Sequence, residues 1–308
     1  MRMKILKVEA EPLKNPARVK KIVSGNVVEY ASMKAFPADI PIQRVSAEQY
    51  IDLRTGEMCE YQRAENKSEC FMSVRKSLRT LRNILNSNCL NESSLRWVTL
   101  TYAENMTDTE QLYKDYDKFW KRFKYYSKKH DIPVPEYISV IEPQGRGAWH
   151  CHVMLIYPDK APYLDNNTVI AKLWGHGFAK TKAVHGVDNI GAYFSAYLAD
   201  LPLDEAQTLG LKGEVLEKAV DASGKTEYKK FVKGARLALY PAGMNIFRTS
   251  RGISRPIETD LSGISAAELE KEKASSGKLT FSNTVAILSD DDEVRNIITH
   301  EYYNIKRK

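Results

Sequence analysis

The feature that most constrains the fold is an alternation of apolar runs with helical segments between residues 93 and 202. The runs are rich in β-branched and aromatic residues, which favours strands. The segments between and after them repeat apolar residues at the spacing of a helix. This β-α-β-β-α-β-α order predicts an α+β fold, a ferredoxin-like or RRM-like antiparallel sheet with helices on one face. The runs are WVTLTY, YISVIEP, WHCHVMLIY and FAKTKAV, and the helical segments are residues 107–130, DNNTVIAKLWG and VDNIGAYFSAYLAD.

The flanking parts of the chain carry weaker patterns. Residues 1–92 begin with short alternations that predict strands, and they end in a basic amphipathic helix from about Ser68 to Asn91. Residues 203–308 contain a hairpin signal, a basic tract and a last stretch that starts acidic and ends basic, as a helix does. We therefore expect three parts: an N-terminal arm with its helix over 1–92, a catalytic core over 93–202, and a C-terminal basic region over 203–308 that binds DNA or a partner.

Charge points to an acidic polymer as a partner. The formal net charge is +7, a moderate excess that suits nucleic acid. Basic residues surround the apolar face of the helical segment at 107–130, and another basic residue follows in the turn QGRGA. We expect Lys121, Arg122 and Arg146 to contact DNA phosphates.

Membrane and disulfide classes are disfavoured. No apolar stretch approaches the roughly 20 residues that a membrane helix needs, and the first residues lack the apolar run of a secretion signal. The four cysteines show no C-x-x-C spacing, so we expect free thiols. These observations predict a cytoplasmic protein with no membrane partner.

Two histidines and a glutamate form the first candidate site. His150 and His152 lie two apart in a predicted strand, so both imidazoles project from the same face. Glu142 ends the preceding strand, and QGRGA predicts a hairpin that brings the two strands side by side. Two imidazoles and one carboxylate with open positions suit a divalent ion such as Mn²⁺ or Mg²⁺. The alternative is that these are ordinary surface residues of a sheet.

Two tyrosines form the second candidate site. Tyr193 and Tyr197 are four apart in a predicted helix and share one face. Aromatic pairs at this spacing usually pack against a sheet. A tyrosine can also attack a phosphodiester if a metal offsets the cost of ionising a phenol whose ordinary pKa is about 10.

The motifs together resemble those of the HUH endonucleases, and within them the rolling-circle replication initiators of plasmids and single-stranded DNA phages. WVTLTY resembles the family's first motif, EPQGRGAWHCH its second and YFSAY its third. The resemblance implies that Glu142, His150 and His152 bind a divalent metal. It also implies that Tyr193 and Tyr197 nick and rejoin single-stranded origin DNA, with a host helicase and DNA polymerase as partners.

One departure from the family concerns charge near the tyrosines. Many relatives place a lysine three residues after a catalytic tyrosine, whereas this chain has Ala196 and Asp200 at those positions. The order of attack by the two tyrosines is therefore open. The N- and C-terminal parts are candidates for binding double-stranded origin DNA, because of their position and charge.

Two alternatives remain from sequence alone. A relaxase or single-strand transposase would share the chemistry, but relaxases as a rule place the tyrosine before the histidines and add a third histidine. A non-catalytic RRM-like nucleic-acid-binding protein would use the same fold with structural histidines and tyrosines. Replacing the histidines would leave such a binder almost unchanged.

Overall fold

The computed structural model describes residues 4–9, 13, 15–36, 42–61, 66–184, 189–191, 198–222, 225–289 and 292–307 of the 308-residue chain. The chain forms two compact units: Met1–Arg63 together with Pro256–Lys308, and Ala64–Arg255. The expected core, residues 93–202, lies wholly within the second unit. That unit also contains the helix before the core and the segment as far as Arg255.

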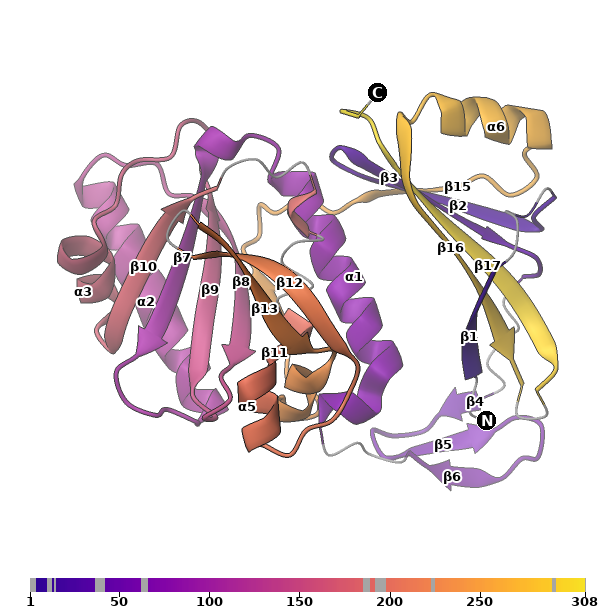
Figure 1. Ribbon diagram of the computed structural model, residues 1–308, viewed down its shortest axis with the longest axis horizontal. Helices are drawn as coiled ribbons and strands as arrows, with labels where there is room; N and C mark the ends of the chain where they lie inside the picture. The colour runs from indigo at the N-terminus through magenta and orange to yellow at the C-terminus, as the bar shows by residue number, and fades with distance from the viewer. Residues whose placement is uncertain are drawn as a thin grey trace. The chain divides into compact units, whose positions relative to one another are not determined.

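The second unit is built on a five-stranded antiparallel sheet with the order β10-β7-β9-β8-β14 (Figure 1). Its first four strands and two helical segments follow each other as β-α-β-β-α-β, the succession of a ferredoxin-like domain. The predicted α+β class is thereby confirmed, and β14 is added at the edge beside β8. The strands are β7 Leu95–Tyr102, β8 Glu136–Pro143, β9 Trp149–Ile156, β10 Gly177–Ala183 and β14 Phe247–Thr249.

Helix α2 (Thr109–Lys129) packs on one face of this sheet. It begins where Asp108 accepts hydrogen bonds from the backbone N–H groups of Glu110 and Gln111. Its buried side marks the covered face, because the Tyr102 hydroxyl donates to Asp115 over 3.1 Å. The next helical segment is η3 Asn166–Ile170 continuing into α3 Ala171–Trp174, which ends at Gly175 with a φ of 75°.

The remaining elements of the second unit flank this core. A three-stranded sheet has the order β11-β13-β12 and carries the predicted hairpin. The strands are β11 Leu201–Pro202, β12 Val215–Ala222 and β13 Lys225–Val232, and the helical segments are η1 Lys67–Cys70, α1 Phe71–Asn88, η2 Glu92–Ser94, α5 Leu203–Thr208 and η4 Ala235–Leu239.

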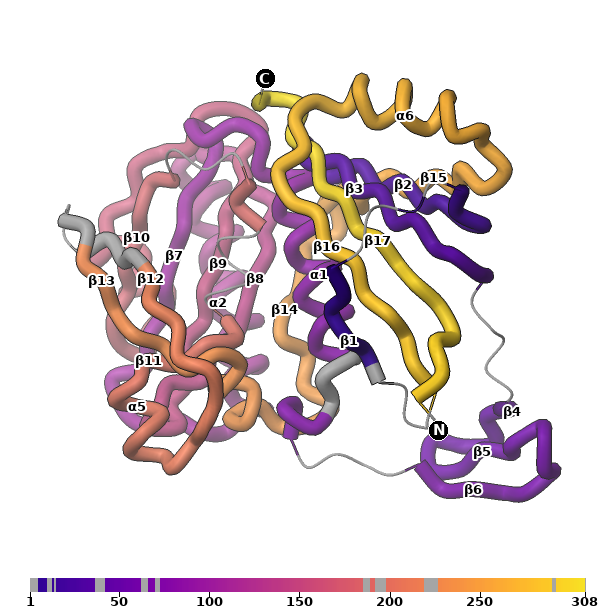
Figure 2. Tube along the Cα trace, turned by 45° about the vertical axis from the view of Figure 1, so that its right-hand side comes forward, coloured from indigo at the N-terminus to yellow at the C-terminus, as the bar shows by residue number. Residues whose placement is uncertain are grey.

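The first unit joins the two ends of the chain in one six-stranded antiparallel sheet with the order β1-β16-β17-β3-β2-β15 (Figure 2). Helix α6 (Ala266–Ala274) packs on it through Leu269, beside Tyr30 and Tyr303. A small sheet of β4, β5 and β6 also belongs here. The strands are β1 Lys4–Val8, β2 Arg18–Ser24, β3 Val27–Met33, β4 Ile42–Arg44, β5 Gln49–Asp52, β6 Met58–Glu60, β15 Ile257–Asp260, β16 Lys278–Leu288 and β17 Val294–Asn304.

The prediction of a helix at the end of the chain is wrong. Residues 294–304 form β17, which pairs with β16 on one side and β3 on the other. The acidic start and basic end of this stretch favour a helix by only about 0.3–1 kcal/mol. Backbone pairing on both edges and burial of alternate residues, among them Thr299, Glu301 and Tyr303, favour the strand.

The helices of both units differ from membrane spans. Within the described ranges, no helix has both the length and the apolar character needed to cross a bilayer.

Candidate metal centre

The register of β8 and β9 brings the three predicted ligands together. Glu142 is the direct partner of His150 across the two strands, and His152 lies two residues further along β9 on the same face. The turn between the strands is tight, since Gln144 accepts from Gly147 over 2.8 Å and Gly147 has a φ of 84°. The ligand atoms of Glu142, His150 and His152 all lie within 4.8 Å of one another.

The metal face and the α2 face of the sheet are opposite. Cys151, between the two histidines, pairs with Leu100 and Ile141, and it is fully buried on the side that also carries Tyr102. Side chains alternate along strands, so His150 and His152 project away from α2.

His152 is held on three sides. Its Nε2 lies 2.5 Å from Oε2 of Glu142, and its Nδ1 lies 3.1 Å from the hydroxyl of Thr99. Trp97 stacks on the ring with a centroid distance of 5.2 Å and an interplanar angle of 14°. These contacts fix the orientation of the imidazole, and a hydroxyl at Nδ1 is the kind of partner that orients a metal-binding histidine.

His150 has the opposite character. Its Nε2 is buried and has no hydrogen-bond partner within the described part of the chain. A buried polar nitrogen without a partner costs free energy unless something else occupies it. A lone pair beside a second imidazole and a carboxylate fits a divalent cation, so the donor set is compatible with a metal.

The electrostatics also suit cation binding. Burial, reinforced by the neighbouring His152, lowers the pKa of His150 to about 4, so the imidazole is neutral at neutral pH, as a ligand must be. Burial alone would raise the pKa of Glu142, but the hydrogen bond with His152 and the charges around it outweigh burial. The pKa of this carboxyl therefore lies below its ordinary value and the group is ionised.

One buried arginine at this site was not predicted from the sequence. Arg236, in η4, places Nη1 2.7 Å from Oε1 of Glu142. The residue lies in the basic tract after the core, where an arginine is expected on the surface. Only the tertiary structure shows that its guanidinium is buried beside the candidate ligands.

The predicted DNA-binding residues fall in two places. Arg146 lies in the β8–β9 turn, where its Nε donates to Gln144 over 3.1 Å. Lys121 and Arg122 lie on α2, on the other side of the sheet from the three ligand candidates. Arg122 donates to the backbone oxygen of Trp174 over 2.8 Å.

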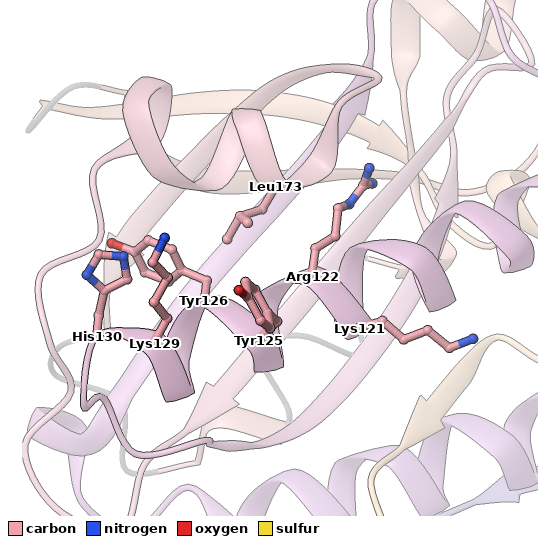
Figure 3. A pocket seen from close by; sticks show the side chains of 7 residues that line it. All are labelled: Lys121, Arg122, Tyr125, Tyr126, Lys129, His130 and Leu173. Atoms are coloured by element: carbon pink, nitrogen blue, oxygen red, sulfur yellow. The ribbon is translucent and has the colours of Figure 1, made fainter.

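Lys121 and Arg122 line a pocket of about 460 Å³ between α2 and α3. Figure 3 shows Tyr125, Tyr126 and Lys129 of α2 around it, with Leu173 reaching in from α3. Tyr125 is 71% exposed. The pocket therefore combines cationic groups with aromatic rings on an open surface.

Tyr193 and Tyr197 lie outside the described residues. The segments on either side are placed: the Gly191 N–H donates to the side chain of Asn86 over 2.9 Å, and Leu198 is buried in the core of the second unit.

Fold and site together define a class: an α+β domain with an antiparallel sheet and a candidate divalent-metal site on one sheet face. A family model for the replication-associated protein ORF2 matches residues 95–201, which contain all three ligand candidates. The match supports a replication initiator of the Rep type, a class that binds DNA. No curated protein and no solved structure matches the chain.

Proposed function

We propose that this protein initiates rolling-circle replication by nicking and rejoining single-stranded origin DNA through a phosphotyrosine intermediate. One observation carries the proposal. Glu142, His150 and His152 converge within 4.8 Å inside the segment that matches the replication-associated family. A relaxase or transposase would use the same chemistry, but the family match favours a replication initiator.

The three ligand candidates would hold Mn²⁺ or Mg²⁺. Such an ion, when bound, would polarise the scissile phosphate and stabilise the charge that develops on the leaving oxygen. The chain's own contribution is orientation. Thr99 and Trp97 fix the ring of His152, and the neutral His150 keeps its buried nitrogen available.

Tyr193 and Tyr197 are the proposed nucleophiles. The phenol oxygen of one of them attacks the phosphorus, its proton passes to solvent, and a bond forms between that oxygen and the 5′ phosphate. The bond from phosphorus to the 3′ oxygen breaks, which releases a 3′-OH that primes synthesis. In the reverse sense, a 3′-OH attacks the phosphotyrosine, or the second tyrosine nicks again, to close the displaced circle.

DNA contacts follow from where the basic residues lie. Arg146, in the turn next to Glu142 and His150, is placed to contact the strand near the scissile phosphate. The pocket at Lys121 and Arg122 lies on the opposite face, so we assign it to a neighbouring part of the strand. An exposed tyrosine beside cations suits a stacked base with its phosphates.

The partners proposed for this reaction are a host helicase, which unwinds the nicked duplex, and a host DNA polymerase, which extends the 3′-OH. The reaction would take place in the cytoplasm. The C-terminal part of the chain is a candidate for binding double-stranded origin DNA.

The test is a cleavage assay with labelled single-stranded DNA libraries and hairpin oligonucleotides in Mn²⁺, resolved on denaturing gels. Wild type should cleave, while His150→Ala and the double variant Tyr193→Phe/Tyr197→Phe should not. If wild type and His150→Ala bind DNA equally well and neither cleaves any substrate with any divalent metal, the protein is a non-catalytic binder.

A further inference from the structure

Arg236 is almost fully buried, with 6% of its surface exposed. Its Nη1 contacts Oε1 of Glu142 at 2.7 Å and also donates to the backbone oxygen of Pro143 over 2.6 Å. Its Nε donates to the backbone oxygen of Asp200 over 3.1 Å. Taking a guanidinium out of water is costly unless it is paired and hydrogen-bonded, and here three oxygens from two segments satisfy it.

The ion pair restricts how Glu142 can bind a cation. Oε1 faces Arg236, and Oε2 faces Nε2 of His152 at 2.5 Å. Only Oε2 therefore points into the space shared with the histidines. Arg236 also balances the charge of the carboxylate, so a divalent ion there would leave the site with a net positive charge for a phosphate.

The same guanidinium is linked to the tyrosine-bearing segment. Asp200 follows Tyr197 by three residues in the chain. Its backbone oxygen accepts from Arg236, its carboxylate accepts from the Gly234 N–H over 2.8 Å, and it forms an ion pair with Lys218. Asp200 is thus tied down from three sides, and Arg236 is the group that also contacts Glu142.

We propose that Arg236 is a positioning residue that holds Glu142 as a one-oxygen metal ligand and fixes the end of the tyrosine-bearing segment relative to it. The proposal rests on the proposed function. Arg236 lies beyond residues 95–201, so the segment after the matched domain would complete its metal centre. The planar fork of arginine is essential, since one group must reach oxygens of two segments at once.

The experiment measures Mn²⁺ affinity by electron paramagnetic resonance and by calorimetry, without DNA, for wild type and Arg236→Lys. Lysine keeps the positive charge but supplies a single point donor. We expect Arg236→Lys to bind Mn²⁺ about tenfold or more weakly, the usual effect of losing a group that orients a metal ligand. Arg248→Lys is the matched control, because Arg248 pairs with Asp117 on the surface, and its affinity should equal that of wild type.

Lys218→Met tests the link to the tyrosine segment without touching Glu142. It removes the ion pair with Asp200 and should leave Mn²⁺ affinity unchanged while lowering the cleavage rate at saturating Mn²⁺. This variant also keeps the proposal testable if Arg236→Lys does not fold, as judged by thermal unfolding.

The outcomes separate two failures. If wild type binds Mn²⁺ and cleaves DNA while folded Arg236→Lys matches it in both, the positioning role is overturned and the proposed function stands. An unchanged cleavage rate in Lys218→Met overturns the link to the tyrosine segment. If wild type neither binds Mn²⁺ through His150 nor cleaves DNA, the proposed function fails, and the role of Arg236 fails with it.

Discussion

Glu142 and His150 are direct partners across the antiparallel pair β8 and β9, although eight residues separate them in the chain. This register places the carboxylate beside both imidazoles, because His152 lies two residues further along the same face. The hairpin turn between the strands thus determines the geometry of the candidate metal centre. A shift of one residue would turn Glu142 to the face covered by α2.

Replacing Glu142 by glutamine should weaken Mn²⁺ binding by about tenfold or more, because a neutral amide oxygen replaces a charged ligand. Calorimetry on the folded variant measures this. Glu136→Gln, at the exposed start of the same strand, is the control and should bind as wild type does. Equal Mn²⁺ affinity in wild type and Glu142→Gln would remove Glu142 from the ligand set.

Thr99 should affect the metal through His152 alone. A neutral histidine that binds metal through Nε2 carries its proton on Nδ1, which here lies 3.1 Å from the Thr99 hydroxyl. Thr99→Val removes that acceptor at nearly constant volume, and we expect Mn²⁺ affinity to fall by about tenfold. Thr101→Val is the control on the same face of β7. If both variants bind Mn²⁺ equally, the hydroxyl does not orient His152.

The pocket on α2 should contribute to DNA affinity without affecting the metal. Lys121→Ala/Lys129→Ala should lower the slope of log affinity for single-stranded DNA against log salt by about 1.4, since each phosphate contact contributes about 0.7. Fluorescence anisotropy over a salt series measures this. Lys114→Ala/Lys124→Ala makes the same charge change on α2 outside the residues that line the pocket. Identical slopes for the two double variants would exclude a DNA contact at the pocket.

The buried cysteines should be unreactive in the folded protein. Burial raises the pKa values of Cys89 and Cys151 to about 12, so almost no thiolate forms at pH 8. In a Cys70→Ser background, we expect a thiol reagent to modify the half-exposed Cys59 first and the other two only after unfolding. Rapid native modification of Cys151 would contradict its placement under α2.

These thiols also predict how stability changes with pH. Their folded-state pKa lies above the ordinary value of about 8.5. Their contribution is therefore complete below about pH 8.5 and is lost as the pH rises toward 12. Urea unfolding at pH 8 and 10 should show the decrease, and Cys89→Ala/Cys151→Ala should show a smaller one.

Local patterns were enough to predict the metal ligands. The period of two in WHCHVMLIY put His150 and His152 on one face, and the glycines of QGRGA predicted the turn that brings Glu142 beside them. The start of α2 could also be predicted, because Asp108 is a helix-capping residue before an amphipathic run.

Contacts distant in sequence could not be predicted in the same way. Nothing in RLALYPAG distinguishes Arg236 from a surface arginine, because its burial depends on Glu142, Pro143 and Asp200. The strand β17 was mistaken for a helix for a similar reason: its partners β3 and β16 come from different parts of the chain. Propensity is a weak guide where tertiary pairing decides.

The most direct test of the central claim is to identify the residue that becomes joined to DNA. After reaction with Mn²⁺ and single-stranded DNA, the protein is digested with nuclease and trypsin and examined by mass spectrometry. Both candidate tyrosines lie in one tryptic peptide, residues 183–212. We predict a nucleotide remnant on Tyr193 or Tyr197 of this peptide, absent with a chelator and in His150→Ala. Cleavage without an adduct, or an adduct on any other peptide, would contradict the proposal.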